Sequence, residues 1–183
     1  MILEIPTDRL LLVPLTSAHA NRMFDLLQDE RLYEYISADP PRSLTTLQTR
    51  YSNLENRTSP QGTEYWFNWV LVDRSSENLL GYVQATIPVN CVFASVAYVL
   101  WYEAWGNGYA TEALGHMMDW LHEALSVPEF RATVDVRNQR SIKVLERCGF
   151  RPVRYVTLNI GRTSHRRFKS KQPRADGPWL TSF

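Results

Sequence analysis

The first part of the chain predicts one strand followed by two helices. Residues 9–15 (RLLLVPL) are almost continuously apolar, which is typical of a buried strand. Apolar side chains then recur at helical spacing over residues 20–27, behind a Thr-Ser pair that can cap a helix. After a break rich in proline, Ser43 can cap a second helix near residues 44–56.

Three β-rich runs follow in close succession, over residues 64–73, 79–87 and 91–102. The connections between them are short and either polar or proline-containing, which favours antiparallel hairpins. In the first run, both sets of alternate positions, which would face opposite sides of a sheet, are mainly apolar. This pattern predicts a sheet that is covered on both sides.

The second half of the chain predicts a crossover unit and two final strands. A helical pattern of apolar residues covers residues 110–124, and residues 130–136 (FRATVDV) predict the strand after it. The strands of such a strand–helix–strand unit are parallel. Another helix follows, and residues 151–160 and 164–171 predict the last two strands. We therefore expect an α/β fold with a mixed, partly antiparallel central sheet flanked by helices.

Two glycines stand where the third β-rich run gives way to a helix. In YEAWGNGYATEAL (residues 102–114), Gly106 and Gly108 bracket Asn107. A simple turn would explain them, since glycine is common in turns. The pattern also suits a phosphate cradle, because glycine lets backbone N–H groups approach an anion and a helix N-terminus directs more of them toward it. The donors would be the N–H groups from Gly106 to Thr111.

A second motif, NQRSIKVLERCGF (residues 138–150), lies one strand further along. At this spacing the two motifs together resemble the GNAT superfamily of acyl-CoA-dependent N-acetyltransferases, and in particular its RimJ/RimL branch. The resemblance covers residues 7–160. It implies a single acetyltransferase domain over residues 1–183, with the GNAT fold, in which the fourth and fifth strands form a parallel pair that splays apart to admit the cofactor. The implied reaction moves an acetyl group from acetyl-CoA to a primary amine by direct attack in a ternary complex.

The resemblance assigns three parts of the chain to acetyl-CoA. The backbone at the end of the fourth strand would pair with the pantetheine arm like an added strand, the glycine loop would hold the pyrophosphate, and the second motif would contact the arm. The residues so assigned are Leu100, Trp101, Tyr102, Gly106, Asn107, Gly108, Tyr109, Ala110, Thr111, Asn138 and Ser141. For Asn138, a role as helix cap is an equal alternative.

The motifs depart from the family at two positions that bear on chemistry. Trp105 stands where the superfamily usually has Arg or Gln, as is often the case in the RimJ/RimL branch, so one side-chain contact to phosphate is missing. Leu145 stands where many relatives have a Tyr that protonates the departing thiolate. Ser141 is then the nearest hydroxyl for the acid. Glu103 could act as base through a water, although a solvated carboxylate at a strand end is the simpler interpretation.

The remaining catalytic expectation concerns the thioester carbonyl, which a backbone N–H near Leu100 or Trp101 would polarise. The acceptor is expected to be a protein N-terminal amine or a small-molecule amine. Tyr35, Trp66 and Tyr155 are the side chains expected to line its site.

The charge of the chain is small overall but uneven. The net charge of +1 over 183 residues argues against nucleic acid or a membrane as the main partner. Residues 1–161 carry 14 basic and 18 acidic side chains, whereas residues 162–183 carry six basic side chains against Asp176 alone. The basic segment suits either a solvated strand or terminus, or a patch for an acidic partner.

Neither a metal site nor a membrane anchor is expected. His116 and His122 do not share a helix face, and Cys91 and Cys148 form no metal-binding pattern. The sequence shows no signal peptide and no apolar run long enough to span a membrane, so we expect a cytoplasmic protein with reduced cysteines. A homodimer remains open.

Other functions compete with acetyl transfer. A dinucleotide-binding loop is disfavoured because Thr111 occupies the place of its third glycine. A non-catalytic CoA-binding or partner-binding domain stays open, given the uncertain base and the missing Tyr. Recognition of a nucleic-acid-linked substrate through the basic segment also stays open.

Overall fold

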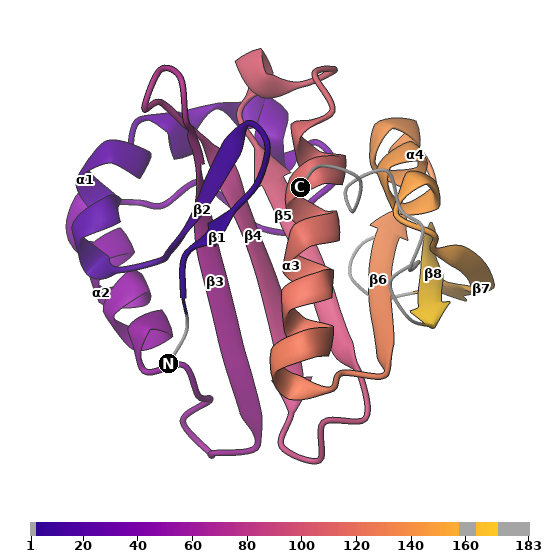
Figure 1. The fold of residues 1–183 in the computed structure, drawn as a ribbon. Helices are drawn as coiled ribbons and strands as arrows, with labels where there is room; N and C mark the ends of the chain where they lie inside the picture. The colour runs from indigo at the N-terminus through magenta and orange to yellow at the C-terminus, as the bar shows by residue number, and fades with distance from the viewer. Residues whose placement is uncertain (1–2, 158–163, 172–183) are drawn as a thin grey trace.

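The computed structural model describes residues 3–157 and 164–171, which build one eight-stranded sheet in the order β1-β2-β3-β4-β5-β6-β8-β7 (Figure 1). All neighbouring strands are antiparallel except β5 and β6, which are parallel. The expected mixed sheet is therefore confirmed. The strands are β1 (Ile5–Pro6), β2 (Leu10–Pro14), β3 (Glu64–Asp73), β4 (Leu79–Pro88), β5 (Ala94–Leu100), β6 (Glu129–Asp135), β7 (Arg151–Thr157) and β8 (Ser164–Lys171).

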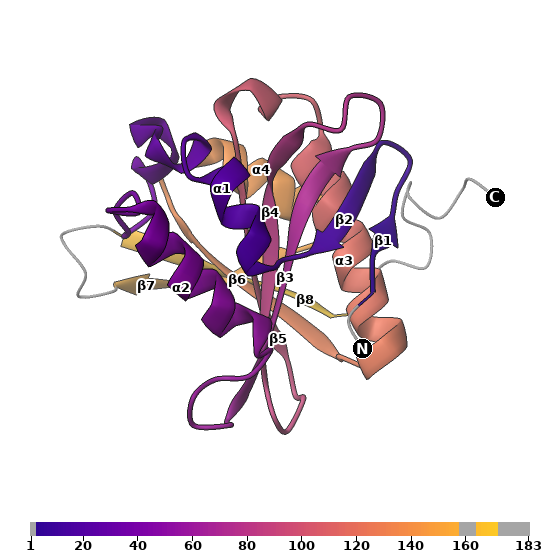
Figure 2. The ribbon, with the colours of Figure 1, turned by 90° about the vertical axis from the view of Figure 1, so that its left-hand side faces the viewer.

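Helices cover both faces of the sheet. The α-helices are α1 (Ala20–Met23), α2 (Leu44–Glu55), α3 (Tyr109–Leu125) and α4 (Gln139–Arg147), and the short 3-10 helices are η1 (Ser17–His19), η2 (Leu26–Gln28), η3 (Glu30–Tyr33) and η4 (Tyr102–Ala104). In Figure 2 the helices α1 and α2 lie on one side of the strands and α3 lies on the other. Two buried clusters correspond to these two layers.

Strand β3 contributes alternate side chains to the two clusters. Trp69 and Leu71 are fully buried beneath α3, whereas Val70 is fully buried beneath α1 and α2. A central strand that buries both of its faces requires apolar residues at nearly every position, as the sequence pattern indicated. The prediction of a sheet covered on both sides is confirmed.

The first expected helix is wrong in extent. Only α1 is α-helical within residues 20–27, and 3-10 turns continue the segment on either side of residue 29. The Asp29 carboxylate accepts a hydrogen bond from the Arg31 N–H and so starts a new turn at that point. Ala20, Met23 and Leu27 are still buried, so burial of apolar side chains rather than continuous helical hydrogen bonding orders this segment.

The parallel strands β5 and β6 are paired only where they begin. Their register contains Ala94 opposite Phe130 and Ser95 opposite Arg131, and no later pair. Residues 96–100, which we call the open edge of β5, therefore have no ladder partner in β6. The expected splay of the parallel pair is present.

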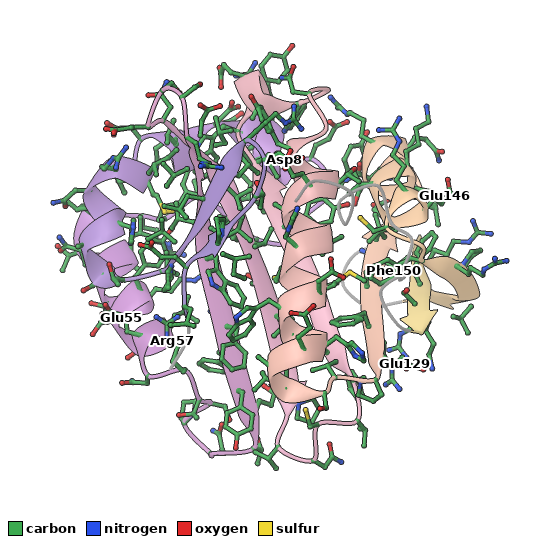
Figure 3. The ribbon with its side chains drawn as sticks, viewed as in Figure 1. Asp8, Glu55, Arg57, Glu129, Glu146 and Phe150 are labelled. Atoms are coloured by element: carbon green, nitrogen blue, oxygen red, sulfur yellow. The ribbon has the colours of Figure 1, made fainter. Side chains whose placement is uncertain are left out.

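The second strand of the C-terminal hairpin lies inside the sheet. β8 pairs with β6 on one side and with β7 on the other, and Phe168 is fully buried. At the beginning of β6, marked by Glu129 in Figure 3, the carboxylate pairs with Lys169 at 3.0 Å and with Arg131. The part of the basic segment over residues 164–171 is thus an interior strand rather than a detachable tail. The rest of that segment lies outside the described residues.

Candidate functional site

The glycine loop has a backbone that only glycine adopts without strain. Gly106 and Gly108 have φ angles of +80° and +82°, in the left-handed region. Gly108 is the N-cap residue of α3 and offers no side-chain cap to the helix. The loop therefore leads the chain from η4 into α3 while leaving the helix N-terminus uncovered.

The N–H groups of residues 106–110 donate to no residue within the described part of the chain. The next two N–H groups along the chain donate to a carbonyl of the loop. Thr111 N–H and Glu112 N–H both donate to the Gly108 carbonyl, at 3.0 and 3.1 Å. The row of free N–H donors therefore ends at Ala110 and not, as expected, at Thr111. Consecutive unpaired N–H groups at a helix N-terminus form an anion-binding site, which the helix dipole strengthens.

Thr111 contributes a second unsatisfied group. Its Oγ1 is buried and has no hydrogen-bond partner among the described residues. Buried hydroxyls are normally satisfied, so this atom marks a position that a ligand or water would complete. Together with the N–H groups, it fits the diphosphate of a coenzyme A.

Arg9 holds the loop from outside. Its Nη1 donates to the Asn107 carbonyl at 2.9 Å, and its Nη2 lies 2.6 Å from the Glu112 carboxylate. Burial alone would raise the pKa of Glu112, but hydrogen bonds from Thr7 and Arg9 hold that pKa below its usual range. Glu112 is thus a structural partner rather than a base. Sequence reasoning missed Arg9 because 103 residues separate it from Glu112.

At the end of β5, some backbone groups are already hydrogen-bonded and others face the side toward β6. Trp101 N–H donates to the Leu80 carbonyl at 2.9 Å and continues the ladder with β4. Because alternate residues of a strand direct their N–H groups to opposite sides, Leu100 N–H faces β6. The expectation for Trp101 is corrected on this point, since its N–H is already engaged. The Leu100 carbonyl accepts from Trp105 Nε1 at 2.7 Å.

The second motif places Asn138 and Ser141 at the start of α4. Asn138 Oδ1 accepts from Ser141 N–H at 3.0 Å, which is the helix-cap role. Ser141 Oγ lies 2.8 Å from the Tyr98 hydroxyl, which also donates to the Ser141 carbonyl at 3.1 Å. Burial raises the pKa of Tyr98, so this phenol stays protonated. Tyr98 was not identified from the sequence, where only its place in an apolar strand is visible.

Glu103 lies in η4 with its side chain 78% exposed. Its Oε1 is 3.9 Å from Arg31 Nη2, at the limit of an ion pair. The carboxylate is therefore in contact with solvent and is not desolvated. This position suits a proton acceptor that works through water, and it equally suits the simpler interpretation of a solvated residue at a strand end.

The three side chains expected around the acceptor lie in different surroundings. The Arg137 guanidinium, directly before the second motif, lies 5.6 Å from the centre of the Tyr35 ring. Trp66 lines a cavity beside α2 and donates through Nε1 to Glu64 at 3.2 Å. Tyr155 lies in β7 opposite Arg166, and its side chain is outside what the structure describes.

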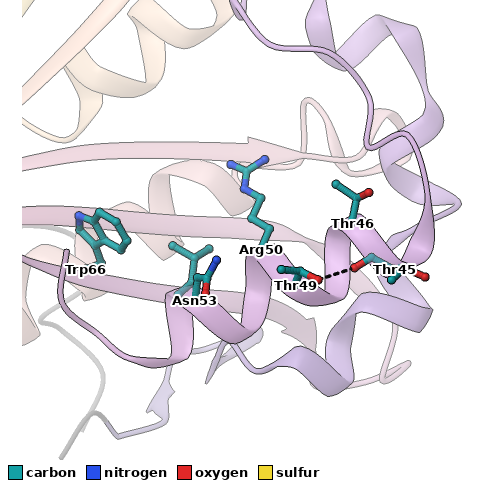
Figure 4. A pocket seen from close by; sticks show the side chains of 7 residues that line it. Thr45, Thr46, Thr49, Arg50, Asn53 and Trp66 are labelled. Atoms are coloured by element: carbon teal, nitrogen blue, oxygen red, sulfur yellow. Dashed lines mark hydrogen bonds between the residues drawn. The ribbon is translucent and has the colours of Figure 1, made fainter. Parts of the chain in front are cut away.

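The α2 cavity has a volume of about 580 Å³, and its lining surface is mostly apolar although most of the residues that form it are polar. Its lining consists of Thr45, Thr46, Thr49, Arg50, Asn53, Leu54 and Trp66 (Figure 4). Arg50 extends outward from α2 and lies close enough to Tyr82 to counteract part of the rise in phenol pKa that burial causes. The Tyr82 ring in turn contacts Trp101, with centroids 6.4 Å apart. The cavity is thus linked through one aromatic pair to the end of β5.

The described residues contain no group of three or more side chains able to hold a metal ion, and none of their helices is long and apolar enough to cross a membrane. Burial raises the pKa of the Cys148 thiol to about 12, so it remains a structural thiol.

Comparison with known proteins shows the family of the chain. Residues 9–151 match the family model described as an acetyltransferase (GNAT) domain. The N-acetyltransferase YoaA of Bacillus subtilis (strain 168), whose name marks it as uncharacterized, is 22% identical over 151 residues, which cover 80% of this chain and 81% of YoaA.

Two solved structures illustrate the range of similar folds. RimL, a ribosomal L7/L12 alpha-N-protein acetyltransferase in complex with coenzyme A, has a TM-score of 0.81 at 17% identity, over 92% of this chain and 98% of RimL. Spermidine N-acetyltransferase from Vibrio cholerae, in complex with CoA and spermine, has a TM-score of 0.74 at 20% identity, over 90% of this chain and 96% of the other. At these identities, both likenesses are likenesses of fold.

Proposed function

Because this chain belongs to the GNAT acetyltransferase family, its reaction is acetyl transfer from acetyl-CoA to an amine, and we propose that the amine attacks directly within a ternary complex. The single observation that carries the cofactor site is the row of unpaired N–H groups over residues 106–110, beside the buried Thr111 hydroxyl. We assign the diphosphate to this row and the pantetheine arm to the open edge of β5.

Acetyl-CoA supplies an acetyl group already activated as a thioester. The residues of this chain must then orient it, polarise its carbonyl and move two protons. We assign carbonyl polarisation to Leu100 N–H, which faces away from β4. Ser141 would donate a proton to the sulfur. Glu103 would accept the amine proton through solvent, as its exposure allows.

The α2 cavity is our candidate for one wall of the acceptor site, with Trp66 in its lining. Arg50 is the charged side chain of that lining, and the lining includes no Asp or Glu. A polycation would meet charge repulsion there, so this wall favours a protein N-terminal amine or a neutral or acidic small amine. Tyr35 and Tyr155 remain proposals for the opposite side.

Binding and turnover measured together test the proposed function. Calorimetry with acetyl-CoA should show binding at a single site, and a panel containing a peptide with a free N-terminal amine, an amino acid and spermidine should show acetylation. Binding without turnover of any amine would favour the non-catalytic CoA-binding alternative. Turnover of spermidine above the peptide and the amino acid would contradict the acceptor assignment.

The location and assembly of the protein stay proposals from the sequence. We propose a cytoplasmic enzyme, which the free thiols of Cys91 and Cys148 support, because such thiols persist in a reducing compartment.

A further inference from the structure

Four side chains form a continuous stack at the end of β5. The Arg31 guanidinium lies 3.7 Å from the Tyr102 ring centre, and the Tyr102 and Trp105 rings are 5.1 Å apart. The Arg140 guanidinium lies 4.2 Å from the Trp105 ring centre. The stack thus joins η3 to α4 across the beginning of the glycine loop.

Trp105 is a fixed platform within this stack. Its Nε1 donates to the Leu100 carbonyl at 2.7 Å, so the indole is anchored to the end of β5. Trp105 is also the residue directly before Gly106, where the row of unpaired N–H groups begins. A guanidinium held on this ring is therefore held beside the proposed phosphate site.

Arg140 is the uncommitted arginine of this region. Arg31 donates to the Asp29 carboxylate through Nε and Nη2, and Arg137 donates to Asp135 in the same way. Arg140 is exposed and makes no hydrogen bond or ion pair with any residue of the described ranges. Stacking on an aromatic face leaves the N–H groups at the rim of a guanidinium free to bind an anion.

We propose that Arg140 binds a phosphate group of the cofactor. Its guanidinium would make the side-chain contact to phosphate that Trp105 does not make. The inference rests on the proposed acetyl-CoA site. Trp105 supplies the platform, α4 supplies the cation, and the glycine loop supplies the N–H groups. Paired, charge-assisted hydrogen bonds from a guanidinium are among the strongest contacts available to a phosphate.

Arg140→Ala tests the proposal through binding alone. Calorimetry at low salt should show the dissociation constant for CoA rising about 10- to 100-fold, as expected for the loss of hydrogen bonds to a charged group. Arg147→Ala removes an arginine from the last turn of the same helix and should leave the constant within about 2-fold. Arg140→Lys keeps the charge but loses the planar stack, so its constant should fall between those of the parent and Arg140→Ala.

Two further measurements make the test specific to phosphate. Pantetheine has no phosphate, so its affinity should be equal for the parent and Arg140→Ala. The salt dependence of CoA binding should be shallower in Arg140→Ala, because one charge contact is gone. Unchanged CoA affinity, or an unchanged salt dependence, would overturn the role of Arg140. Failure of the parent protein to bind CoA would instead overturn the proposed function.

Discussion

The Tyr98 hydroxyl lies 2.8 Å from Ser141 Oγ and so links β5 to α4 across the side on which β5 has no partner strand. A tyrosine has one hydroxyl hydrogen, which can go either to the Ser141 carbonyl or to Ser141 Oγ. In the second arrangement the Ser141 hydrogen is released and can point toward a sulfur atom. Tyr98 is therefore placed to orient the proposed acid.

Ser141→Ala should lower kcat while leaving the dissociation constant for acetyl-CoA within about 2-fold. A positioned acid contributes about 10²–10⁴ in rate, and a thiolate is a good leaving group, so we expect a loss near 10- to 100-fold. Steady-state kinetics with calorimetry measures both quantities. A variant with the parent kcat would remove Ser141 from the mechanism and leave solvent as the acid.

Tyr98→Phe should produce a smaller loss in kcat, about 3- to 10-fold, because Ser141 is kept but its orientation is not. The decisive readout is the double variant Tyr98→Phe/Ser141→Ala. If Tyr98 acts through Ser141, the double variant should have the kcat of Ser141→Ala alone. Independent, multiplying losses would show that Tyr98 serves the structure rather than the acid.

Gly108→Val should raise the dissociation constant for CoA at least 10-fold. A branched residue at a φ of +82° is strained, and this strain would disturb the row of N–H groups, whereas a Cβ there would make only an ordinary contact with Arg9 Nη2, at 3.5 Å. Gly62→Val is the matched control, since Gly62 has a φ of +67° with nothing within 4 Å of its Cβ position. Equal CoA affinity in both variants would contradict the phosphate cradle.

Arg50→Ala should raise the KM for the acceptor about 5- to 10-fold without changing the KM for acetyl-CoA. The reason is that Arg50 supplies the charge of the α2 cavity lining and lies apart from the glycine loop. Arg42→Ala, at an exposed position ahead of α2, serves as control. An acceptor KM that stays at the parent value would separate the α2 cavity from the acceptor site.

Asp119→Asn should stabilise the protein above pH 6. Burial, with help from the Glu123 charge, raises the pKa of Asp119 to about 6, so the folded state binds this proton more tightly than the unfolded state. Stability is therefore lost as pH rises from about 4 to 6, and an uncharged residue avoids that loss. Because the side chain is only half-buried, we expect about 1 kcal/mol, or 2–4 °C in Tm at pH 7.5.

Thermal melts of Asp119→Asn at pH 7.5 and pH 4 provide the check. The gain should shrink at the lower pH, where Asp119 is largely protonated in the folded parent. Asp39→Asn, in an exposed loop, is the matched control for the loss of one carboxylate. A gain of the same size at both pH values would contradict the titration of Asp119 as its cause.

Local signals in the sequence predicted much of the fold. Ser43 caps α2 as expected, with Oγ accepting from Thr46 N–H at 3.1 Å, because a cap depends on residues three apart. The left-handed φ of Gly149, +79°, ends α4 for an equally local reason. The order of strands around the parallel pair followed from the crossover unit.

The rest depended on contacts between distant residues. Arg9 reaches Glu112 over 103 positions, and Tyr98 reaches Ser141 over 43, and neither distance leaves a periodic signal in one chain. The use of Trp101 N–H by Leu80 depends on the register of β4 against β5. Such register is set by packing across the sheet, so alternation along one strand could not reveal it.

The short pairing between β5 and β6 also bears on how the molecule unfolds. The unit made of β6, β8, β7 and α4 is joined to the larger part of the sheet by two register positions, the Tyr98 hydroxyl, the Arg140–Trp105 stack, the Cys148 thiol that donates to the Thr111 carbonyl, and the shared core under α3. The protein is therefore expected to open first between this unit and the rest of the sheet when it unfolds partially. A pantetheine arm laid along β5 would act as a missing strand, so amide exchange in β6 should slow far more than in β3 when cofactor binds. Binding of the cofactor would then make the unfolding of the two parts of the sheet more cooperative.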